Sequence, residues 1–307
     1  MDKKGKMIVL TGPTAVGKTA LSIALAKEIG GEIISADSMQ VYRYMDIGSA
    51  KISKEEMQGV PHHLIDVLDP SEEFHVYRFQ QMAKEAVNEI YQKGHIPIVA
   101  GGTGFYIQAL LYDIDFSTEE DHTALRAELE KVAAEKGGAY LHEQLKEIDP
   151  VSAQEIHPNN QKRIIRALEF YCLNGAKISD HNQMQRQKEA AYDFRYFVLN
   201  DDRARLYQRI EERVDEMLEK GLLNEVKRLK EMGYQRDLVS MQGLGYKELL
   251  SHLAGECTLN EAIYLIKRNT RRFAKRQLTW FRRERNIIWL EKDTINNNLR
   301  EILSFLT

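Results

Sequence analysis

An eight-residue segment near the N-terminus, Gly12 to Thr19, has the pattern of a phosphate-binding loop. Its two glycines let the backbone curl so that the N–H groups point at a bound anion. Lys18 adds a positive charge to that cradle, and the hydroxyl group of Thr19 is a suitable ligand for Mg²⁺. The pattern predicts a polyphosphate site without saying which polyphosphate is bound. The residues of this predicted site are Gly12, Pro13, Thr14, Ala15, Val16, Gly17, Lys18 and Thr19.

The acidic residue that could act at this site is Asp37, which follows the expected strand Glu32–Ser35. In an open α/β sheet, ligands bind beyond the carboxyl ends of the strands, so Asp37 should face the bound phosphates. Three roles are open to it: a ligand of Mg²⁺ through water, a general base, or the N-cap of a short helix over Met39–Tyr42. Its position alone does not decide among them.

A glycine-rich turn, Gly101-Gly102-Thr103, follows the expected strand His95–Ala100. In many nucleotide hydrolases such a strand ends in the aspartate that holds Mg²⁺-bound water. The missing carboxylate disfavours a simple ATPase and leaves Asp37 as the better acid near the phosphates. The glycines either allow close approach of a bulky group such as a base or form a plain tight turn. His62 and His63 are predicted to be polar loop residues, because adjacent histidines point in different directions and no third metal ligand is evident.

Several arginines fall on a helix that we expect to begin near Asp202. Arg209 and Arg213 are four residues apart in the sequence, and they therefore lie on one face of that helix. An arginine that reaches the phosphates from outside the loop would stabilise charge on a leaving group. For most of these arginines, ion pairs with acidic neighbours on a solvated surface are the expectation.

A strongly basic helix is expected near the C-terminus. The formal net charge of −3 argues against a nucleic-acid partner, but the segment 267–285 holds nine basic residues and one acidic residue. This excess of positive charge predicts that the segment binds an anionic polymer. Arg272 and Lys275 are expected to lie on its basic face. A second basic patch is expected at Asn160–Arg166. The basic face is expected to lie opposite apolar residues that repeat every seven positions, Ile266, Phe273 and Trp280.

Short apolar runs alternate with amphipathic helices at both ends of the chain, as in parallel α/β folds. After Tyr112 the chain is instead rich in charge and helix formers, without a convincing strand. We predict an α/β protein with a P-loop NTPase-like parallel sheet core, residues 1–112 and 194–307, and a mostly helical insertion, residues 113–193. The expected strands are Met7–Leu10, Glu32–Ser35, His95–Ala100, Arg195–Leu199 and Asn286–Leu290. The helices expected in the insertion are Leu125–Lys136, Ala139–Ile148 and Asn160–Cys172, followed by a polar stretch, Ser179–Lys188.

The composition, 43% hydrophobic and 29% charged residues, is that of an ordinary soluble protein. No stretch approaches the roughly 20 apolar residues that span a bilayer. The N-terminus does not have the pattern of a signal peptide. Cys172 and Cys257 stand in no metal-ligand spacing, so we expect reduced thiols. We expect a cytoplasmic monomer without a membrane partner.

Taken together, these motifs resemble those of the bacterial tRNA dimethylallyltransferases, also called tRNA isopentenyltransferases. The likeness extends over nearly the whole chain, and the order of the motifs makes it specific. The eukaryotic relatives' additional zinc-binding tail is absent. The matching segments are Gly12–Thr19, Ile34–Ser38, Met45–Gly48, Gly101–Thr103, His157–Asn159, Gly245-Tyr246 and Thr270–Trp280.

The resemblance implies transfer of a dimethylallyl group from dimethylallyl diphosphate to N6 of the adenosine on the 3′ side of the tRNA anticodon. The phosphate loop would hold the diphosphate leaving group, Asp37 would be the general base, and Arg213 would neutralise the developing charge. Thr19 with Mg²⁺ would bind the diphosphate, with Asp37 a further ligand of Mg²⁺ through water. Gln40 would read the adenine edge. By the same resemblance, and with the basic helix added, the residues expected to contact the anticodon stem-loop are Asp37, Ser38, Met39, Gln40, Thr103, Arg126, Gln161, Lys162, Arg163, Ile164, Ile165, Arg272 and Lys275.

Two other classes of function stay open from the residues alone. A small-molecule kinase would use the same loop for ATP, with Asp37 activating a hydroxyl group, but would leave the basic helix without a role. A non-catalytic, RNA-binding nucleotide switch would explain the basic helix but not Asp37. The released product distinguishes them: ADP indicates a kinase, diphosphate a prenyltransferase, and binding without turnover a switch.

Overall fold

The computed structural model describes residues 4–116 and 123–306. The chain forms two compact units. The first, which we call the core unit, comprises residues 1–111 and 191–307, and the second, the insertion unit, comprises residues 112–190. These boundaries lie within three residues of those expected from the sequence. Each unit is described by itself.

The core unit is built on a six-stranded sheet in which every pairing is parallel. Five strands confirm the apolar runs expected from the sequence, and with them the α/β fold class. In the sheet register Gly101 stands beside both Thr11 and Ala36, so the segments that follow these residues leave the same edge. In sheet order the strands are β3 (His62–His63), β2 (Gly31–Ala36), β4 (Ile96–Gly101), β1 (Lys6–Thr11), β5 (Asp193–Asn200) and β6 (Ile287–Glu291).

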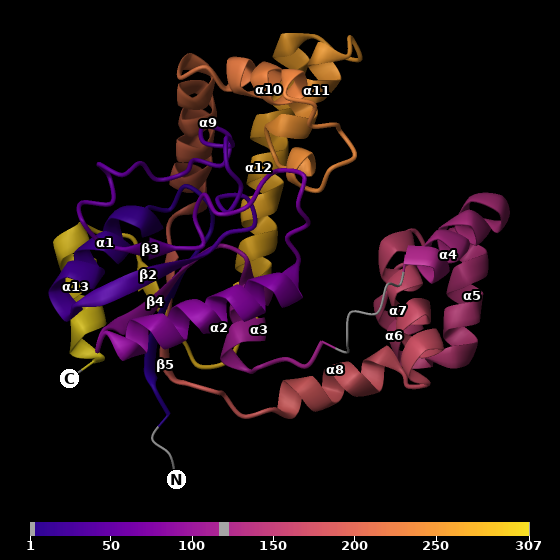
Figure 1. Cartoon of the computed structure of the whole chain (residues 1–307), viewed down its shortest axis with the longest axis horizontal. Helices are drawn as coiled ribbons and strands as arrows, with labels where there is room; N and C mark the ends of the chain where they lie inside the picture. The colour runs from indigo at the N-terminus through magenta and orange to yellow at the C-terminus, as the bar shows by residue number, and fades with distance from the viewer. Residues whose placement is uncertain (1–3, 117–122, 307) are drawn as a thin grey trace. The chain divides into compact units, whose positions relative to one another are not determined.

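Helices pack on both faces of this sheet (Figure 1). Ile8 and Leu10 of β1 point into an apolar cluster to which α1 (Lys18–Ile29) and α13 (Ile295–Ser304) contribute. Because neighbouring residues on a strand face opposite ways, the buried Met7 and Val9 point to the other face. There α2 (Val76–Gln92) packs on β2 and β4 and on α3 (Gly104–Leu111).

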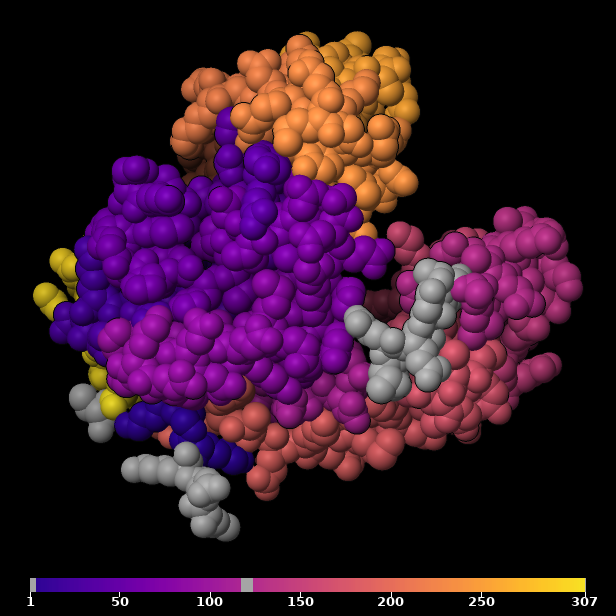
Figure 2. Space-filling model, in the orientation of Figure 1, coloured from indigo at the N-terminus to yellow at the C-terminus, as the bar shows by residue number. Residues whose placement is uncertain are grey.

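The remaining helices of the core unit are α9 (Arg203–Glu219), α10 (Leu222–Glu231), α11 (Tyr246–Leu253) and α12 (Leu259–Phe281), with a 3₁₀ turn at Ser240–Gln242. Helices α9 and α12 pack together and lead away from the sheet toward α10 and α11 (Figure 1). In the space-filling view the segment around α10 and α11, in orange, stands out from the rest of the core unit (Figure 2).

The predicted seven-residue repeat does not describe the buried face of α12. Phe273 and Trp280 are only half-buried, although Ile266 is buried as expected. The buried positions follow the 3.6-residue period of a straight helix, because α12 packs on α9, α11 and α3 along different parts of its length. The buried residues of α12 are Ala262, Ile266, Ala274, Gln277 and Phe281.

In the described part of the insertion unit, all regular secondary structure is helical. The three expected helices are confirmed, and the polar stretch Ser179–Lys188 is a helix as well. That helix has no buried residue, so its sequence has no apolar periodicity from which a helix could be predicted. A small core that includes Leu141, Leu145 and Leu168 holds the unit together. The helices are α4 (Thr123–Lys136), α5 (Gly138–Ile148), α6 (Pro150–Glu155), α7 (Gln161–Asn174) and α8 (Ile178–Gln187). None of the helices that the structure describes, in either unit, is both long and apolar enough to cross a membrane.

The prediction that His62 and His63 lie in a loop is wrong, because they form the short edge strand β3 beside β2. Glu32 of β2 is 1% exposed, and its carboxylate is 2.7 Å from both His63 Nε2 and His95 Nδ1 and 3.1 Å from Lys93 Nζ. A two-residue polar strand has no period that a sequence could reveal. Among residues 4–116 and 123–306 no cluster of His, Cys, Asp or Glu is suited to a metal ion. His63 and His95 instead hydrogen-bond Glu32, and His62 bonds the Val60 carbonyl oxygen.

Glu32 should make the stability of the core unit fall at acid pH. Burial raises the pKa of this carboxyl, but the hydrogen bonds from His63, His95 and Lys93 outweigh burial and lower the pKa from 4.5 to about 2. A depressed carboxyl pKa stabilises the fold above its ordinary value, and that contribution, about 3 kcal/mol, is lost as the pH falls from 4.5 to 2. Urea unfolding across this range should show a steeper loss for the natural chain than for Glu32→Gln. Glu28→Gln, on the exposed side of α1, is the control and should behave as the natural chain; equal slopes for all three would contradict the assignment.

Candidate active site

The phosphate loop connects β1 to α1, and its backbone curls around the side chain of Lys18. Gly12 adopts φ +148°, and a Cβ atom there would stand 2.3 Å from the carbonyl oxygen of Leu199, so only glycine fits. Gly17, at φ +103°, is the N-cap of α1, and no side chain caps the helix. The Lys18 ammonium donates to the carbonyl oxygens of Gly12 at 2.9 Å and Pro13 at 2.8 Å. These contacts turn the loop carbonyls toward Lys18 and leave the N-terminal end of α1 open.

Contacts from distant parts of the core unit hold the loop. The Thr14 N–H donates to Gln277 Oε1 at 3.0 Å, and Arg209 Nε donates to the Ala15 carbonyl oxygen at 2.9 Å. Within the described part of the chain, no acceptor takes the N–H groups of Ala15, Val16 and Gly17. Backbone N–H groups in folded proteins are normally paired, so this uncapped helix start is arranged for an anion.

Asp37 caps a turn, and one of its oxygen atoms remains available. Its Oδ1 accepts the N–H groups of Met39 at 2.8 Å and Gln40 at 3.3 Å. The turn does not continue into the short helix that we considered over Met39–Tyr42. Oδ2 has no hydrogen-bond partner among the residues described. The capping role and a role in proton transfer are therefore compatible, because they use different oxygens of one carboxylate.

Lys18, Asp37 and Arg213 lie within electrostatic range of one another. Burial lowers the pKa of Lys18 to about 7; Arg213 adds to this effect, and Asp37 opposes it. Burial likewise lowers the pKa of Arg213, which the carboxylate of Asp37 opposes. Two partly desolvated cations thus converge on the phosphate loop; the carboxylate of Asp37 acts on both, and that of Glu216 acts on Arg213. An anion bound here would relieve the repulsion between the cations.

The turn Gly101–Thr103 packs directly beside Asp37. A Cβ atom on Gly101 would lie 2.2 Å from the carbonyl oxygen of Ala36, to which the Thr103 N–H donates at 3.2 Å. The glycines therefore serve close packing of two strand ends, and Thr103 is placed next to Asp37.

Gln277 is a site residue that the sequence analysis missed. Its side chain is 6% exposed; its Oε1 takes the Thr14 N–H, and its Nε2 donates to the Gly102 carbonyl oxygen at 2.9 Å. It thus joins the phosphate loop to the Gly101–Thr103 turn from α12. The one available signal was its spacing, three residues after Ala274 and four before Phe281, which puts a polar side chain on the buried face.

Replacing Gln277 by leucine should loosen the phosphate loop. The change leaves the Thr14 N–H and the Gly102 carbonyl oxygen without partners, which we expect to cost about 2 kcal/mol of stability. Affinity for diphosphate should fall with it, because the loop is no longer held in one conformation. Thermal unfolding and diphosphate titration measure the two effects. Lys275→Leu, at an exposed position of the same helix, is the control and should keep the stability and the diphosphate affinity of the natural chain; equal effects of the two changes would contradict this reading.

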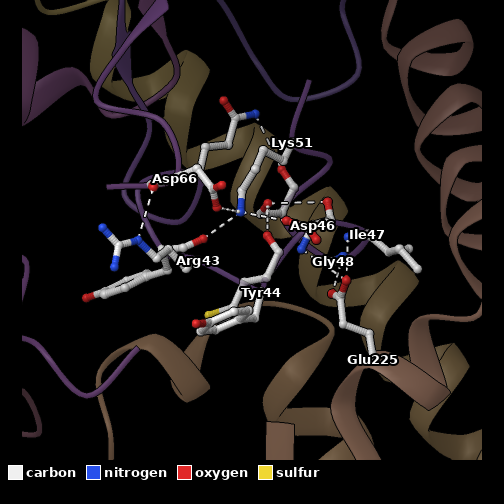
Figure 3. Close-up of polar contacts among 12 residues, drawn as sticks. Arg43, Tyr44, Asp46, Ile47, Gly48, Lys51, Asp66 and Glu225 are labelled. Atoms are coloured by element: carbon white, nitrogen blue, oxygen red, sulfur yellow. Dashed lines mark hydrogen bonds and ion pairs between the residues drawn. The ribbon is translucent and has the colours of Figure 1, made fainter. Parts of the chain in front are cut away.

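The segment that follows Asp37–Gln40 is anchored by two buried groups (Figure 3). Glu225 of α10 accepts the N–H groups of Asp46, Ile47 and Gly48 at 2.8–3.1 Å. It also accepts the hydroxyl group of Tyr246 at 2.7 Å. A Cβ atom on Gly48 would lie 2.5 Å from the Tyr246 ring, which accounts for the glycine. One carboxylate therefore explains two separate motifs of the sequence, Met45–Gly48 and Gly245-Tyr246.

Lys51 is the second anchor (Figure 3). Its ammonium bonds the Tyr42 carbonyl oxygen at 2.6 Å and the carboxylates of Asp46 and Asp66 at 2.7 and 2.9 Å. These contacts hold the backbone around Lys51 in one conformation. That backbone in turn orients Gln40, because its Nε2 donates to the Ala50 carbonyl oxygen at 3.2 Å. The amide that we expect to read a base is therefore oriented by a braced backbone.

The expected RNA contacts of the insertion unit divide into accessible and buried residues. Arg126 makes a two-pronged ion pair with the buried Glu169, at 2.9 and 3.1 Å, while its side chain remains half-exposed. Gln161, Lys162 and Arg163 are exposed on the first turn of α7. Ile164 and Ile165 instead lie in the core of the insertion unit, so their side chains are not available to a partner on its surface. The resemblance supplied all five as one consecutive segment, although the apolar spacing of Ile164, Ile165 and Leu168 already marks a buried helix face.

The basic face of α12 is partly neutralised by α9. Lys267 pairs with Asp215, and Arg271 pairs with Glu211. Arg272 and Lys275 are exposed, and neither has an acidic partner in the described residues. These two basic side chains therefore remain free for an external anion.

The fold and the site together define a P-loop-like α/β protein whose phosphate loop lies near one carboxylate, Asp37, and two cations, Lys18 and Arg213. A family described as IPP transferase matches residues 40–284 of the chain. A tRNA dimethylallyltransferase of Lachnoclostridium phytofermentans is 59% identical over 98% of this chain and 97% of its own length. One from Carboxydothermus hydrogenoformans is 53% identical over 97% and 96%. The chain belongs to the IPP transferase family.

Solved structures agree with this assignment. The full-length tRNA isopentenylpyrophosphate transferase of Bacillus halodurans is 46% identical, with a TM-score of 0.75 over 99% of this chain and 96% of that one. A eukaryotic dimethylallyltransferase, studied acting on tRNA, is 31% identical, with a TM-score of 0.82 over 98% of this chain and 79% of that one. The family favours a prenyltransferase over the small-molecule kinase and the nucleotide switch.

Proposed function

We propose that this chain transfers a dimethylallyl group from dimethylallyl diphosphate to N6 of the adenosine on the 3′ side of the tRNA anticodon and releases diphosphate. Membership of the IPP transferase family supports the reaction class. The observation that carries the proposal is the convergence of the open phosphate loop, Lys18, Arg213 and the free oxygen of Asp37 at one edge of the sheet. We further propose that the protein acts as a monomer in the cytoplasm.

The proposed chemistry is a substitution at the first carbon of the dimethylallyl group. The N6 amine forms a bond to that carbon while the carbon–oxygen bond to diphosphate breaks. Asp37 Oδ2 takes the proton that the amine loses, and Oδ1 stays engaged with the Met39 and Gln40 N–H groups. Lys18, Arg213 and the N–H groups of the phosphate loop take up the negative charge of the leaving diphosphate.

The donor set beside the loop fits a diphosphate-bound Mg²⁺. The Thr19 hydroxyl group is exposed at the start of α1 and makes no hydrogen bond within the described residues. One hydroxyl group, with Asp37 acting through water, leaves the other positions of the ion to diphosphate oxygens and water, which Mg²⁺ accepts. When bound, the ion would supply further positive charge to the leaving group.

We propose that tRNA is bound through its backbone by exposed basic residues and through the target base by Asp37–Gln40 and Thr103. A base within a stacked anticodon loop cannot reach the Asp37 carboxylate, so it must be turned out of the stack. Arg272 and Lys275 supply the charge from α12. Arg126 and the exposed residues Gln161–Arg163 supply contacts from the insertion unit.

Replacing Arg272 and Lys275 together by alanine should weaken tRNA binding and flatten its salt dependence. Each phosphate contact contributes about one unit to the slope of log affinity against log salt, so the slope should fall by about two. Fluorescence anisotropy with labelled tRNA at several salt concentrations measures the slope. Lys267→Ala with Arg271→Ala is the matched control, because those side chains already pair with acids. A slope unchanged by the first pair would remove this face from the interface.

Product analysis tests the proposed function directly. The purified chain is incubated with dimethylallyl diphosphate, Mg²⁺ and unmodified tRNA, and nucleosides are examined by mass spectrometry. The prenyl mass on adenosine, with stoichiometric release of diphosphate, is the expected result. Formation of ADP from ATP without prenylation, or tRNA binding without turnover of any donor, would contradict it.

A further inference from the structure

Lys292 follows β6 and lies beside the phosphate loop. Its backbone N–H donates to the Asn200 carbonyl oxygen at 2.8 Å, which fixes it at the carboxyl edge of the sheet. A Cβ atom on Gly17 would lie 3.2 Å from Lys292 Nζ. The ammonium therefore stands next to the open start of α1, although 275 positions separate the two residues in the sequence (292 − 17).

Among the residues described, none is a hydrogen-bond or ion-pair partner of the Lys292 ammonium. The side chain is half-buried. Asp201 is the carboxylate that attracts it, but its two oxygens already pair with Arg205 at 3.0 Å and Arg209 at 2.5 Å. Burial and the neighbouring Arg209 both lower the pKa of Lys292. A half-buried cation among other cations is unfavourable until an anion joins it.

The loop beside Lys292 is open for an anion. Gly17 has no side chain to separate Lys292 from the helix start, and no side chain caps α1. The N–H groups of Ala15, Val16 and Gly17 are unpaired within residues 4–116 and 123–306. Lys18 contacts the loop through the carbonyl oxygens of Gly12 and Pro13, and Lys292 approaches it at Gly17, so the two ammonium groups stand at different parts of the loop.

We propose that Lys292 is a further ligand of the diphosphate and reaches the phosphate loop from the end of β6. The inference rests on the proposed function for the identity of the anion. Together with Lys18 and Arg213, Lys292 neutralises the charge of the diphosphate group. Gly17 is a glycine in part because a side chain there would separate Lys292 from the ligand.

Titration of inorganic diphosphate with Mg²⁺ into the full chain tests this role. Loss of one charged hydrogen bond weakens binding roughly tenfold or more, which is the result expected for Lys292→Met. Lys292→Arg keeps the charge and should bind within roughly threefold of the natural chain. Lys230→Met, on the exposed surface of α10, is the control and should bind as the natural chain does. Affinity for tRNA should be the same in all four proteins.

The outcomes separate the inference from the proposed function. Equal diphosphate affinity of the natural chain and a folded Lys292→Met variant overturns the role of Lys292 and leaves the proposed function intact. Failure of the natural chain to bind diphosphate overturns the proposed donor, and the inference with it. Acetylation of lysines in the unaltered chain, read by peptide mass spectrometry, needs no variant. Diphosphate should protect Lys292 and not Lys230, and equal labelling of Lys292 with and without diphosphate also overturns the inference.

Discussion

Asp37→Asn is expected to slow prenyl transfer about a thousandfold, the middle of the range for loss of a general base. The asparagine carbonyl oxygen can still accept the Met39 and Gln40 N–H groups, so the turn should remain folded. What is lost is the second carboxylate oxygen, which would take the proton of the N6 amine. Single-turnover measurement with saturating donor and tRNA isolates this step from binding and product release.

Binding controls make the Asp37 prediction specific. Removal of a negative charge beside the phosphate loop should not weaken binding of diphosphate in the absence of Mg²⁺, because the carboxylate repels the anion. Affinity for tRNA should stay near that of the natural chain. Asp237→Asn, at an exposed aspartate without a described partner, should have full activity. Full single-turnover activity of Asp37→Asn would remove Asp37 as the base.

Arg213→Gln is expected to reduce kcat by about a hundredfold to a thousandfold, the effect of removing one group that stabilises transition-state charge. The diphosphate gains negative charge as the carbon–oxygen bond breaks, and Arg213 is half-buried beside Lys18 and Asp37. Arg213→Lys should be intermediate, because it keeps the charge without the planar group. Steady-state kinetics with varied dimethylallyl diphosphate measure the effect.

The KM for the donor should change less than kcat in Arg213→Gln. Arg213 lowers the pKa of Lys18, so its loss lets Lys18 hold a proton more firmly and compensates for part of the lost attraction for the ground-state diphosphate. Arg203→Gln, whose guanidinium lies on the Tyr207 ring at the surface of α9, is the control on the same helix. Equal loss in binding and turnover would make Arg213 an ordinary anion ligand.

The strands and the phosphate loop could be predicted because their signals are local. Eight consecutive residues specify the loop, and runs such as Met7–Leu10 specify buried strands by composition alone. Asp37 could be placed near the loop because the carboxyl ends of parallel strands share one edge. The edge strand β3 and helix α8, which has no buried residue, escaped prediction because neither has a periodic apolar pattern.

The parts of the site that escaped prediction depend on contacts between distant residues. Gln277 bonds a loop residue 263 positions away, and Glu225 binds Asp46 across 179 positions. In the sequence, both are ordinary polar residues of a helix. The burial of Ile164 and Ile165 did have a signal, their apolar spacing with Leu168 on α7, but the resemblance placed them among the RNA contacts.

The sequence by itself determined the parallel sheet, the phosphate-binding loop at its edge and a carboxylate nearby. That information lies in short segments whose conformation follows from their own glycines, apolar runs and strand ends. Only the tertiary structure decided which side chains hold the loop, which oxygen of Asp37 is available, and that Lys292 stands beside Gly17. The physical reason is that burial and long-range hydrogen bonds are properties of packed elements, and they do not exist until the strands and helices have come together.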